Sequence, residues 1–304
     1  MDSNYNNSKG ISYTSGFLML IGLALLGLVV SGAISVFLLT ATGKPAIEAI
    51  NDPENAGMLR LIQAISVLIS MFLPAVIVAS MLNRKPFQLL GYRKDAELKQ
   101  VGLVALIVFT SLFIAGSLGY LNKAIPLPDY LKTKFDAAEQ SYTDQVEMMM
   151  DFKNIGGYII SLLIMAFVPA VCEETLFRGG LQNFLSKAIK SPWISIIIVS
   201  ILFSIVHFSF YGFLPRMFLG FVLGLIFYYT GNIWLSITAH FFNNALAVTA
   251  AYVSIQQGKN IKEAMNEDVS VSYWGFIAIP ILVLLLIALK KTAHDSNHSR
   301  SYRS

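Results

Sequence analysis

The stretch IISLLIMAFVPAVCEETLFRGG, residues 159–180, decides the fold class of this chain. A long apolar run leads directly into three charged residues, Glu173, Glu174 and Arg178, and the spacing predicts one continuous helix through all of them. A charged group at the centre of a bilayer costs roughly 2.5–3.5 kcal/mol on insertion scales, so these side chains are expected to face protein or water. The stretch therefore predicts a membrane-spanning helix whose polar face is turned toward the interior of a helical bundle.

The composition of the whole chain is typical of a membrane protein. Of its 304 residues, 55% are hydrophobic and 13% are charged, whereas roughly 25% of the residues in a soluble domain are charged. A stretch of about 20 apolar residues is long enough to cross the hydrocarbon layer. Such stretches predict helices at about 15–41, 57–82, 100–121, 157–187, 192–210, 213–230, 232–253 and 272–290. We therefore expect an all-α fold, a polytopic membrane helix bundle with about eight transmembrane helices.

The domain organisation is expected to be simple. Residues 15–293 are predicted to form a single transmembrane helical domain, with a motif-bearing core at about 157–253. Polar tails, expected to be disordered, precede and follow it at 1–14 and 294–304. The single cysteine, Cys172, excludes an intramolecular disulfide and any metal site built from several cysteines.

The distribution of charge between loops predicts the orientation in the membrane. Lysine and arginine gather in the 83–99 loop and after residue 290, whereas the 122–156 loop holds six acidic residues against four lysines and 42–56 is also acid-rich. Positively charged loops stay in the cytoplasm, so both termini are expected there. Because the basic residues are divided between loops of a membrane protein, the net charge of +4 does not indicate a nucleic-acid partner.

The polar 122–156 loop contains helix-forming sequence. Tyr130, Leu131, Phe135 and Ala138 fall on one side of a predicted amphipathic helix. Such a helix could lie on the outer membrane surface or act as a lid. The sequence leaves both interpretations open.

The charged residues of the 159–180 stretch have different predicted partners. Glu174 and Arg178 are four residues apart on one helix face, with the acid on the N-terminal side, so they are expected to pair with each other. Glu173 is rotated by about 100° from Glu174 and needs another partner. The helix must continue to about residue 187, because a helix that ended at Cys172 would place Glu173 far from the later polar residues.

Those later residues repeat the spacing of four. Phe203 precedes His207 and His240 precedes Asn244 by four residues, and no other histidine lies in a predicted membrane helix. A carboxylate, two imidazoles and a carboxamide at similar depth predict a catalytic or metal-coordinating group. Each feature alone has a structural explanation: the Glu174–Arg178 pair could brace a helix, a single histidine could be a hydrogen-bonded core residue, and Asn244 could join two helices. A purely structural bundle has no need for all of them together.

The three motifs together resemble the CPBP family, membrane proteases related to type II CAAX prenyl endopeptidases and to bacteriocin-processing or immunity proteins. The family pattern E-E-x-x-x-R corresponds to Glu173–Arg178, F-x-x-x-H to Phe203–His207, and H-x-x-x-N to His240–Asn244, in the family's order. The resemblance covers about 157–253, since the earlier helices share only their hydrophobicity with the family.

The resemblance implies hydrolysis of peptide bonds in membrane-associated protein or peptide substrates. Glu173 would activate a water molecule, His207 would share that water, and His240 with Asn244 would stabilise the oxyanion of the tetrahedral intermediate. The other motif residues would support the site: Glu174, Arg178 and Phe203. Relatives occur in bacteria that have no prenylated proteins, so the resemblance does not imply a CAAX substrate and leaves prenylation of the substrate open. The predicted location is the bacterial cytoplasmic (inner) membrane.

A metal ion is one alternative for the chemistry. His207, His240 and Glu173 could make a zinc site with two histidines, one carboxylate and an open position for water. The chain lacks H-E-x-x-H, which places two ligands on one helix. We therefore favour a reaction without a metal or other cofactor.

Two other functions fit the same residues. Glutamate and histidine inside a membrane also occur in ion-coupled or proton-coupled transporters, although the chain has no internal repeat and no matched pair of broken helices. A non-catalytic immunity or binding protein could also use this fold.

Overall fold

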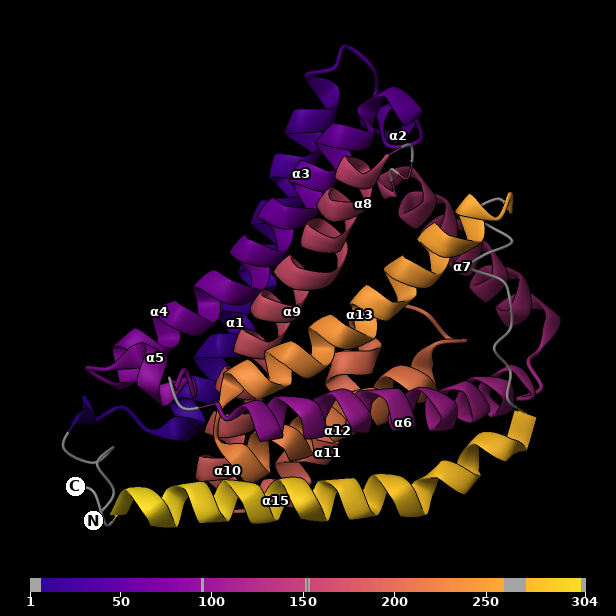
Figure 1. Ribbon diagram of the computed structural model, residues 1–304. Coiled ribbons are helices and arrows are strands. Elements are labelled where there is room, and N and C mark those ends of the chain that lie inside the picture. The colour runs from indigo at the N-terminus through magenta and orange to yellow at the C-terminus, as the bar shows by residue number, and fades with distance from the viewer. Residues whose placement is uncertain (1–6, 94–95, 151, 153, 260–271, 302–304) are drawn as a thin grey trace.

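The computed structural model describes residues 7–93, 96–150, 152, 154–259 and 272–301, and these form helices and connecting loops (Figure 1). Within these residues, six helices are long and apolar enough to cross a membrane: Tyr13–Thr40, Ala56–Leu82, Leu98–Lys123, Ile155–Ile189, Phe213–Thr230 and Ser272–Asp295. The chain is a polytopic helical membrane bundle, which confirms the predicted fold class.

Some of the long helices consist of several consecutive elements, in which π-helical segments (η3, η4 and η5) join α-helical ones. In chain order, the elements of the described residues are α1 (Tyr13–Thr40), α2 (Ala46–Ala49), η2 (Pro53–Asn55), α3 (Ala56–Val67), η3 (Leu68–Phe72), α4 (Leu73–Leu82), α5 (Pro86–Leu89), α6 (Leu98–Lys123), α7 (Asp129–Met149), α8 (Ile155–Ser161), η4 (Leu162–Phe167), α9 (Val168–Glu174), η5 (Thr175–Gln182), α10 (Asn183–Ile189), α11 (Pro192–Ile205), α12 (Phe213–Thr230), α13 (Ile233–Gln256), η6 (Ser272–Ala278) and α15 (Ile279–Ser301).

The expected number of eight spans is not found, because two of the predicted helices differ from the other six. The helix predicted at 192–210 ends at Ile205, so α11 has 14 residues and a length of about 21 Å, short of the hydrocarbon thickness. The chain turns after it, and Phe208 there has a φ of 49°, a strained conformation for a bulky side chain. The α13 helix is long enough, with 24 residues, but it is not among the six apolar spans, and it carries the polar residues His240 and Asn244 in its middle.

The helix around the charged residues continues without a break from Ile155 to Ile189, as predicted. Proline at position 169 removes one backbone N–H from the helix and crowds the carbonyl one turn earlier. The helix accommodates this with the wider π-helical segment η4 directly before Pro169, and η3 precedes Pro74 in the same way. A third π-helical segment, η5, contains Arg178. The irregular backbone therefore lies on both sides of the two glutamates.

The helices form two groups that meet at this long helix. In the first, α1 packs against α3, η3, α4 and α10, with Leu20 and Phe184 in its apolar core. In the second, α6 packs against α12, α13 and α15, with Val104 and Ile226 in its core. Figure 1 shows α6 and α15 running side by side at a steep angle to α1. Because α9 and η5 contact helices of both groups, the charged residues lie at the junction.

The prediction that both tails are disordered is wrong in part. Backbone hydrogen bonds of 2.9 Å join Lys9 N to Leu82 O and Arg84 N to Asn7 O, so Asn7 to Lys9 are held against the end of α4. At the other end of the chain, α15 continues to Ser301 instead of ending near residue 290. The paired segments also place the N-terminal region beside the 83–99 loop.

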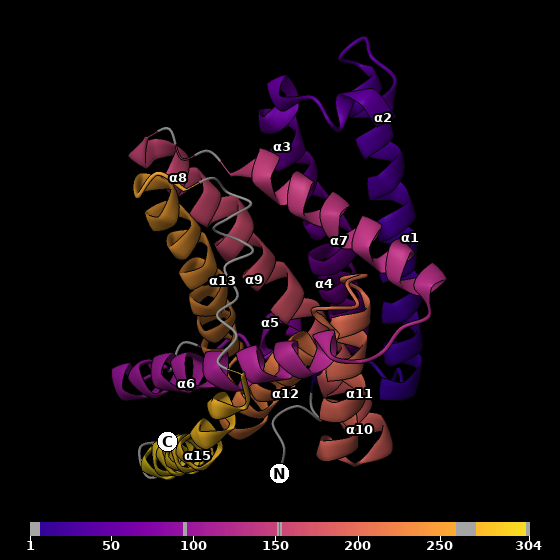
Figure 2. The ribbon, with the colours of Figure 1, turned by 90° about the vertical axis from the view of Figure 1, so that its right-hand side faces the viewer.

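The polar 122–156 loop contains the 21-residue helix α7 on the outside of the bundle (Figure 2). Its inner side agrees with the predicted one only in part. Phe135 was predicted there and stacks on Phe210 with ring centroids 4.7 Å apart, and Val146 is also buried. Tyr130, which was expected on the apolar side, is 65% exposed. The helix therefore lies against the turn that follows α11.

Candidate active site

The Glu174–Arg178 ion pair forms as predicted and is completely buried. Arg178 Nη1 donates to Glu174 Oε1 at 2.7 Å. Arg178 Nη2 donates to Gly220 O at 3.0 Å, and the guanidinium carbon lies 4.6 Å from the centroid of the Phe203 ring. Since Gly220 lies on α12 and Phe203 on α11, Arg178 fastens the long helix to two neighbours.

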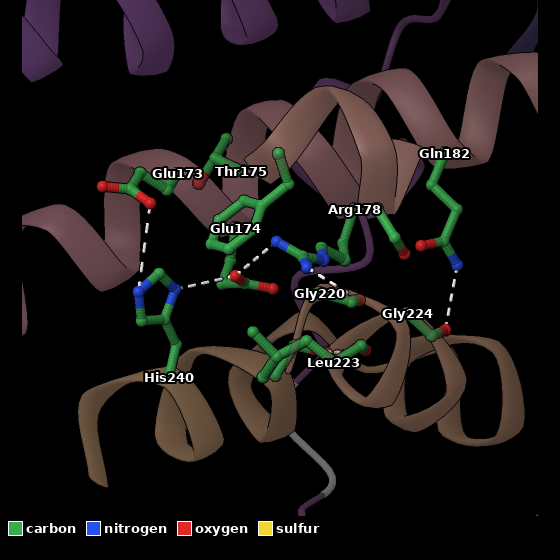
Figure 3. A network of polar contacts seen from close by, with 12 residues as sticks. Glu173, Glu174, Thr175, Arg178, Gln182, Gly220, Leu223, Gly224 and His240 are labelled. Atoms are coloured by element: carbon green, nitrogen blue, oxygen red, sulfur yellow. Dashed lines mark hydrogen bonds and ion pairs between the residues drawn. The ribbon is translucent and has the colours of Figure 1, made fainter. Parts of the chain in front are cut away.

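Two glycines of α12 make this close contact possible. Gln182 Nε2 donates to Gly224 O at 2.9 Å, one turn along from the Arg178–Gly220 bond (Figure 3). A Cβ atom on Gly224 would lie 2.9 Å from Gln182 Oε1 and 3.0 Å from the Ile196 side chain. The sequence analysis missed these residues, although small residues spaced four apart in an apolar helix are a known pattern for close helix contacts.

His240 lies between the two glutamates. Its Nδ1 donates to Glu174 Oε1 at 2.8 Å, and its Nε2 lies 3.9 Å from Glu173 Oε2 (Figure 3). Glu173 Oε2 is buried and has no hydrogen-bond partner among the described residues. Glu174 therefore does more than pair with Arg178, because its carboxylate also determines which ring nitrogen of His240 faces Glu173.

His207 lies just beyond the end of α11. Its Nδ1 donates to Phe203 O at 2.7 Å, so in the neutral imidazole the lone pair is on Nε2. The Phe203 ring lies between the two histidines, with centroid distances of 5.0 Å to His207 and 5.8 Å to His240. The turn after Ile205 and the Phe203 ring thus determine where this imidazole lies.

Asn244 is oriented by its neighbour in the sequence. Asn243 Nδ2 donates to Asn244 Oδ1 at 3.1 Å, which directs the Nδ2 donor of Asn244 to the opposite side of its carboxamide. Both side chains line the same cavity. Asn243 was not singled out by the sequence analysis.

All four candidate catalytic residues line one cavity of about 880 Å³. Glu173 comes from α9, His207 from the turn after α11, and His240 and Asn244 from α13. Much of the remaining wall is apolar and includes these residues: Val108, Val146, Met149, Met150, Met165, Leu219, Val222, Leu223, Val248 and Ala251. The structure brings the four residues to one place, and their chemical roles stay predictions.

The suggested zinc site would be formed by His207, His240 and Glu173. Among the described residues, no group of three or more histidine, cysteine, aspartate or glutamate side chains is arranged to hold a metal ion. Nδ1 of His240 is bonded to Glu174 and Nδ1 of His207 to a backbone carbonyl, so only the Nε2 atom of each ring is left to act as a metal ligand. We therefore derive no reaction step through a metal.

The part of the chain that carries the site matches a known family model. Residues 155–246 match the family model for type II CAAX prenyl endopeptidase Rce1-like proteins. The predicted resemblance is thereby confirmed for this segment, which begins with α8 and ends within α13. Comparisons with curated proteins and with solved structures give no match. The Rce1-like segment contains the candidate catalytic residues, whereas α1 to α7 and α15 lie outside it.

One charged residue of the Rce1-like segment was missed by the sequence analysis. Arg216 is in the first turn of α12 and lines the cavity. A single arginine within an otherwise apolar predicted membrane helix is a signal that could have been noticed, because ionisable residues inside such helices are rare and often functional.

Proposed function

We propose that the chain is an intramembrane endopeptidase that hydrolyses peptide bonds of membrane-associated proteins or peptides. The observation that carries this proposal is the buried carboxylate of Glu173, whose Oε2 lacks a hydrogen-bond partner among the described residues and faces His240 in the cavity. Burial of a carboxylate oxygen without a partner costs free energy, so its presence in the cavity needs an explanation, and a functional role provides one. The similarity of residues 155–246 to a family of endopeptidases supports the reaction class.

In the proposed first step, Glu173 acts as the general base. Its carboxylate accepts a proton from a water molecule while the water oxygen attacks the carbonyl carbon of the scissile peptide bond. His207 accepts a second hydrogen bond from this water through Nε2, since its Nδ1–H is already bonded to Phe203 O. The water is thus held between the base and the imidazole.

The oxyanion formed in this step needs hydrogen-bond donors. His240 Nε2 and Asn244 Nδ2 are the proposed donors, and removal of one such donor in other enzymes costs about 3 kcal/mol of transition-state stabilisation. Because Nδ1 of His240 is bonded to Glu174, Nε2 carries a proton only when the ring is protonated. In the proposed scheme the imidazolium form of His240, bonded to the Glu174 carboxylate, makes this bond to the oxyanion.

The reaction ends with transfer of the first proton. Glu173, now protonated, gives that proton to the nitrogen of the leaving amine as the carbon–nitrogen bond breaks. The products are a carboxylic acid and an amine, and Glu173 returns to its ionised form. No metal or other cofactor takes part in this scheme.

The cavity and the charged loops support the proposed substrate class and orientation. An apolar wall with Met149, Met150 and Met165 favours an apolar peptide segment, because methionine adapts to different side chains. We place both termini in the cytoplasm of a bacterial inner-membrane protein. Asn7 to Lys9 lie beside Leu82 to Arg84, so the N-terminal region and the basic 83–99 loop are on one side.

The proposal is tested with the purified full chain in detergent and a library of fluorogenic apolar peptides. Glu173→Gln removes the base but keeps the shape, so kcat is expected to fall by about 10²- to 10⁴-fold with an unchanged melting temperature. Glu48→Gln is the matched control, because Glu48 is exposed on α2 and distant in the sequence from the motifs. A metal chelator is expected to leave cleavage unchanged.

Three results would contradict the proposal. Unchanged turnover by Glu173→Gln would show that Glu173 is not the base. Loss of turnover in the presence of a chelator would show that the reaction needs a metal ion. A wild-type chain that binds the peptides without cleaving any of them would favour a non-catalytic binding protein.

A further inference from the structure

Arg216 is a charged residue of the cavity wall that the proposed mechanism does not use. Its Nη1 atom is buried and has no hydrogen-bond partner among the described residues. Its guanidinium carbon lies 5.7 Å from the centroid of the Tyr142 ring on α7. No ion pair of Arg216 is found in the described part of the chain, and Glu173, the one acidic residue along the cavity wall there, faces His240. The cavity therefore contains a cation without a protein anion.

Gly212 holds the guanidinium group in this position. A Cβ atom on Gly212 would lie 2.2 Å from Arg216 Nη1 and 2.5 Å from its guanidinium carbon. Gly212 is the residue that precedes α12, and its backbone N–H donates to Ser209 Oγ at 3.1 Å. The guanidinium group thus packs on the backbone of the turn that also carries His207, and any larger residue at position 212 would displace it.

A buried guanidinium nitrogen without a partner is unfavourable, and the simplest compensation is an anionic ligand that accepts its hydrogen bond. Arginine presents several N–H donors in one plane, a geometry that suits a carboxylate. The nearby cavity wall is mostly apolar, with Leu219 and Val222 on the same helix, so it offers little to a strongly hydrated anion but suits a carboxylate attached to an apolar peptide.

We propose that Arg216 binds a carboxylate of the peptide substrate, and this inference rests on the proposed endopeptidase function. The carboxylate belongs either to the C-terminus or to an acidic side chain of the peptide. Binding at Arg216 anchors the peptide at the wall formed by α12, while Glu173 and His240 act from α9 and α13. The anchored carboxylate then determines which peptide bond reaches Glu173.

Binding is measured in the Glu173→Gln variant of the full chain, so that cleavage does not interfere. The probes are fluorescently labelled peptides of leucine and valine in three forms: with a free C-terminal carboxylate, with a C-terminal amide, and with a C-terminal amide and one internal glutamate. A charge-assisted hydrogen bond predicts that at least one carboxylate form binds roughly 10- to 100-fold more tightly than the uncharged amide. The form that gains affinity identifies the source of the carboxylate.

Two variants assign the preference to Arg216. Arg216→Gln is expected to abolish the preference for the carboxylate peptide with little change in affinity for the amide. Gly212→Ala keeps the charge but displaces the guanidinium group, and is expected to weaken the preference as well, at small structural cost because the displaced group is the end of a flexible side chain. Arg84→Gln is the control, because Arg84 is exposed and does not line the cavity.

Several results would overturn the inference: equal affinity for charged and uncharged peptides, no binding of any peptide, or a preference that survives in both Arg216→Gln and Gly212→Ala. Failure of the proposed function looks different. If the chain with Glu173 intact prefers carboxylate peptides through Arg216 but never cleaves them, the carboxylate site is supported and the endopeptidase function is rejected.

Discussion

The two sides of the cavity are held together by different kinds of contact. On one side, α9, η5 and α13 are joined by the buried Arg178–Glu174–His240 hydrogen bonds. On the other side, α7 lies against the turn after α11 through contacts at the surface. Tyr211 donates to Asp136, and Ser209 donates to Glu139 at 2.7 Å.

From this difference we expect the side of α9, η5 and α13 to be the rigid side and the α7 side to be the mobile side. Breaking a buried ion pair by removing one partner costs about 3–5 kcal/mol, whereas exposed polar pairs contribute about 0–1 kcal/mol. Glu173 and His240 are therefore positioned on the rigid side. The α7 side, which lines the cavity with Tyr142 and Val146, is held by the weaker contacts.

The largest effect is expected from Arg178→Ala on the rigid side. It leaves Glu174 buried with a single partner, so the free energy of unfolding should fall by about 3–5 kcal/mol. Thermal and denaturant unfolding in detergent measure this loss. Arg84→Ala, at an exposed position, should change stability by less than about 0.5 kcal/mol. An Arg178→Ala variant with normal melting but no activity would contradict the structural role of this arginine.

An intermediate effect is expected from Glu174→Gln. Glutamine keeps an oxygen for the bonds from Arg178 and His240 but removes the negative charge beside the imidazole ring. Partners that orient a functional histidine typically contribute about 10- to 100-fold to activity. We therefore expect kcat to fall by about this factor while KM changes little. Steady-state kinetics on a cleaved peptide provide the measurement, and a change confined to KM would mean that Glu174 acts on substrate binding instead.

The smallest effect is expected from Tyr211→Phe on the mobile side. The hydrogen bond to Asp136 raises the pKa of Tyr211 above its ordinary value of 10.0, because it holds the neutral phenol. A raised pKa means that the contact contributes fully below about pH 10 and is lost as pH rises through the higher value. The protection of α7 against hydrogen exchange, relative to the intrinsic exchange rate at each pH, should therefore fall at high pH in the wild-type chain, and already at neutral pH in Tyr211→Phe.

This last variant should leave the overall melting temperature almost unchanged, because the contact is exposed. Equal protection of α7 in both chains at neutral pH would show that the stacking of Phe135 on Phe210, and not the polar contact, holds α7 in place.

The sequence by itself determined the parts of the protein that depend on neighbours along the chain. The apolar runs placed the helices, and the spacing of four predicted the Glu174–Arg178 pair, because residues one turn apart are in contact wherever the helix lies. The continuity of the helix through Pro169 also followed from local rules, since a proline bends a membrane helix more often than it ends one. The errors at the ends, such as the helix predicted to 210, arose where a turn inside an apolar stretch left no clear signal.

Only the tertiary structure decided which helices meet. The Glu174–His240 bond joins residues 66 apart in the sequence, and the Arg178–Gly220 bond joins residues 42 apart. A membrane helix is apolar on most faces, so the hydrophobic pattern that orients a helix in a soluble protein says little about its partners here. Small residues, buried hydrogen bonds and the space left between helices make that choice, and they placed Arg216 in the same cavity as Glu173.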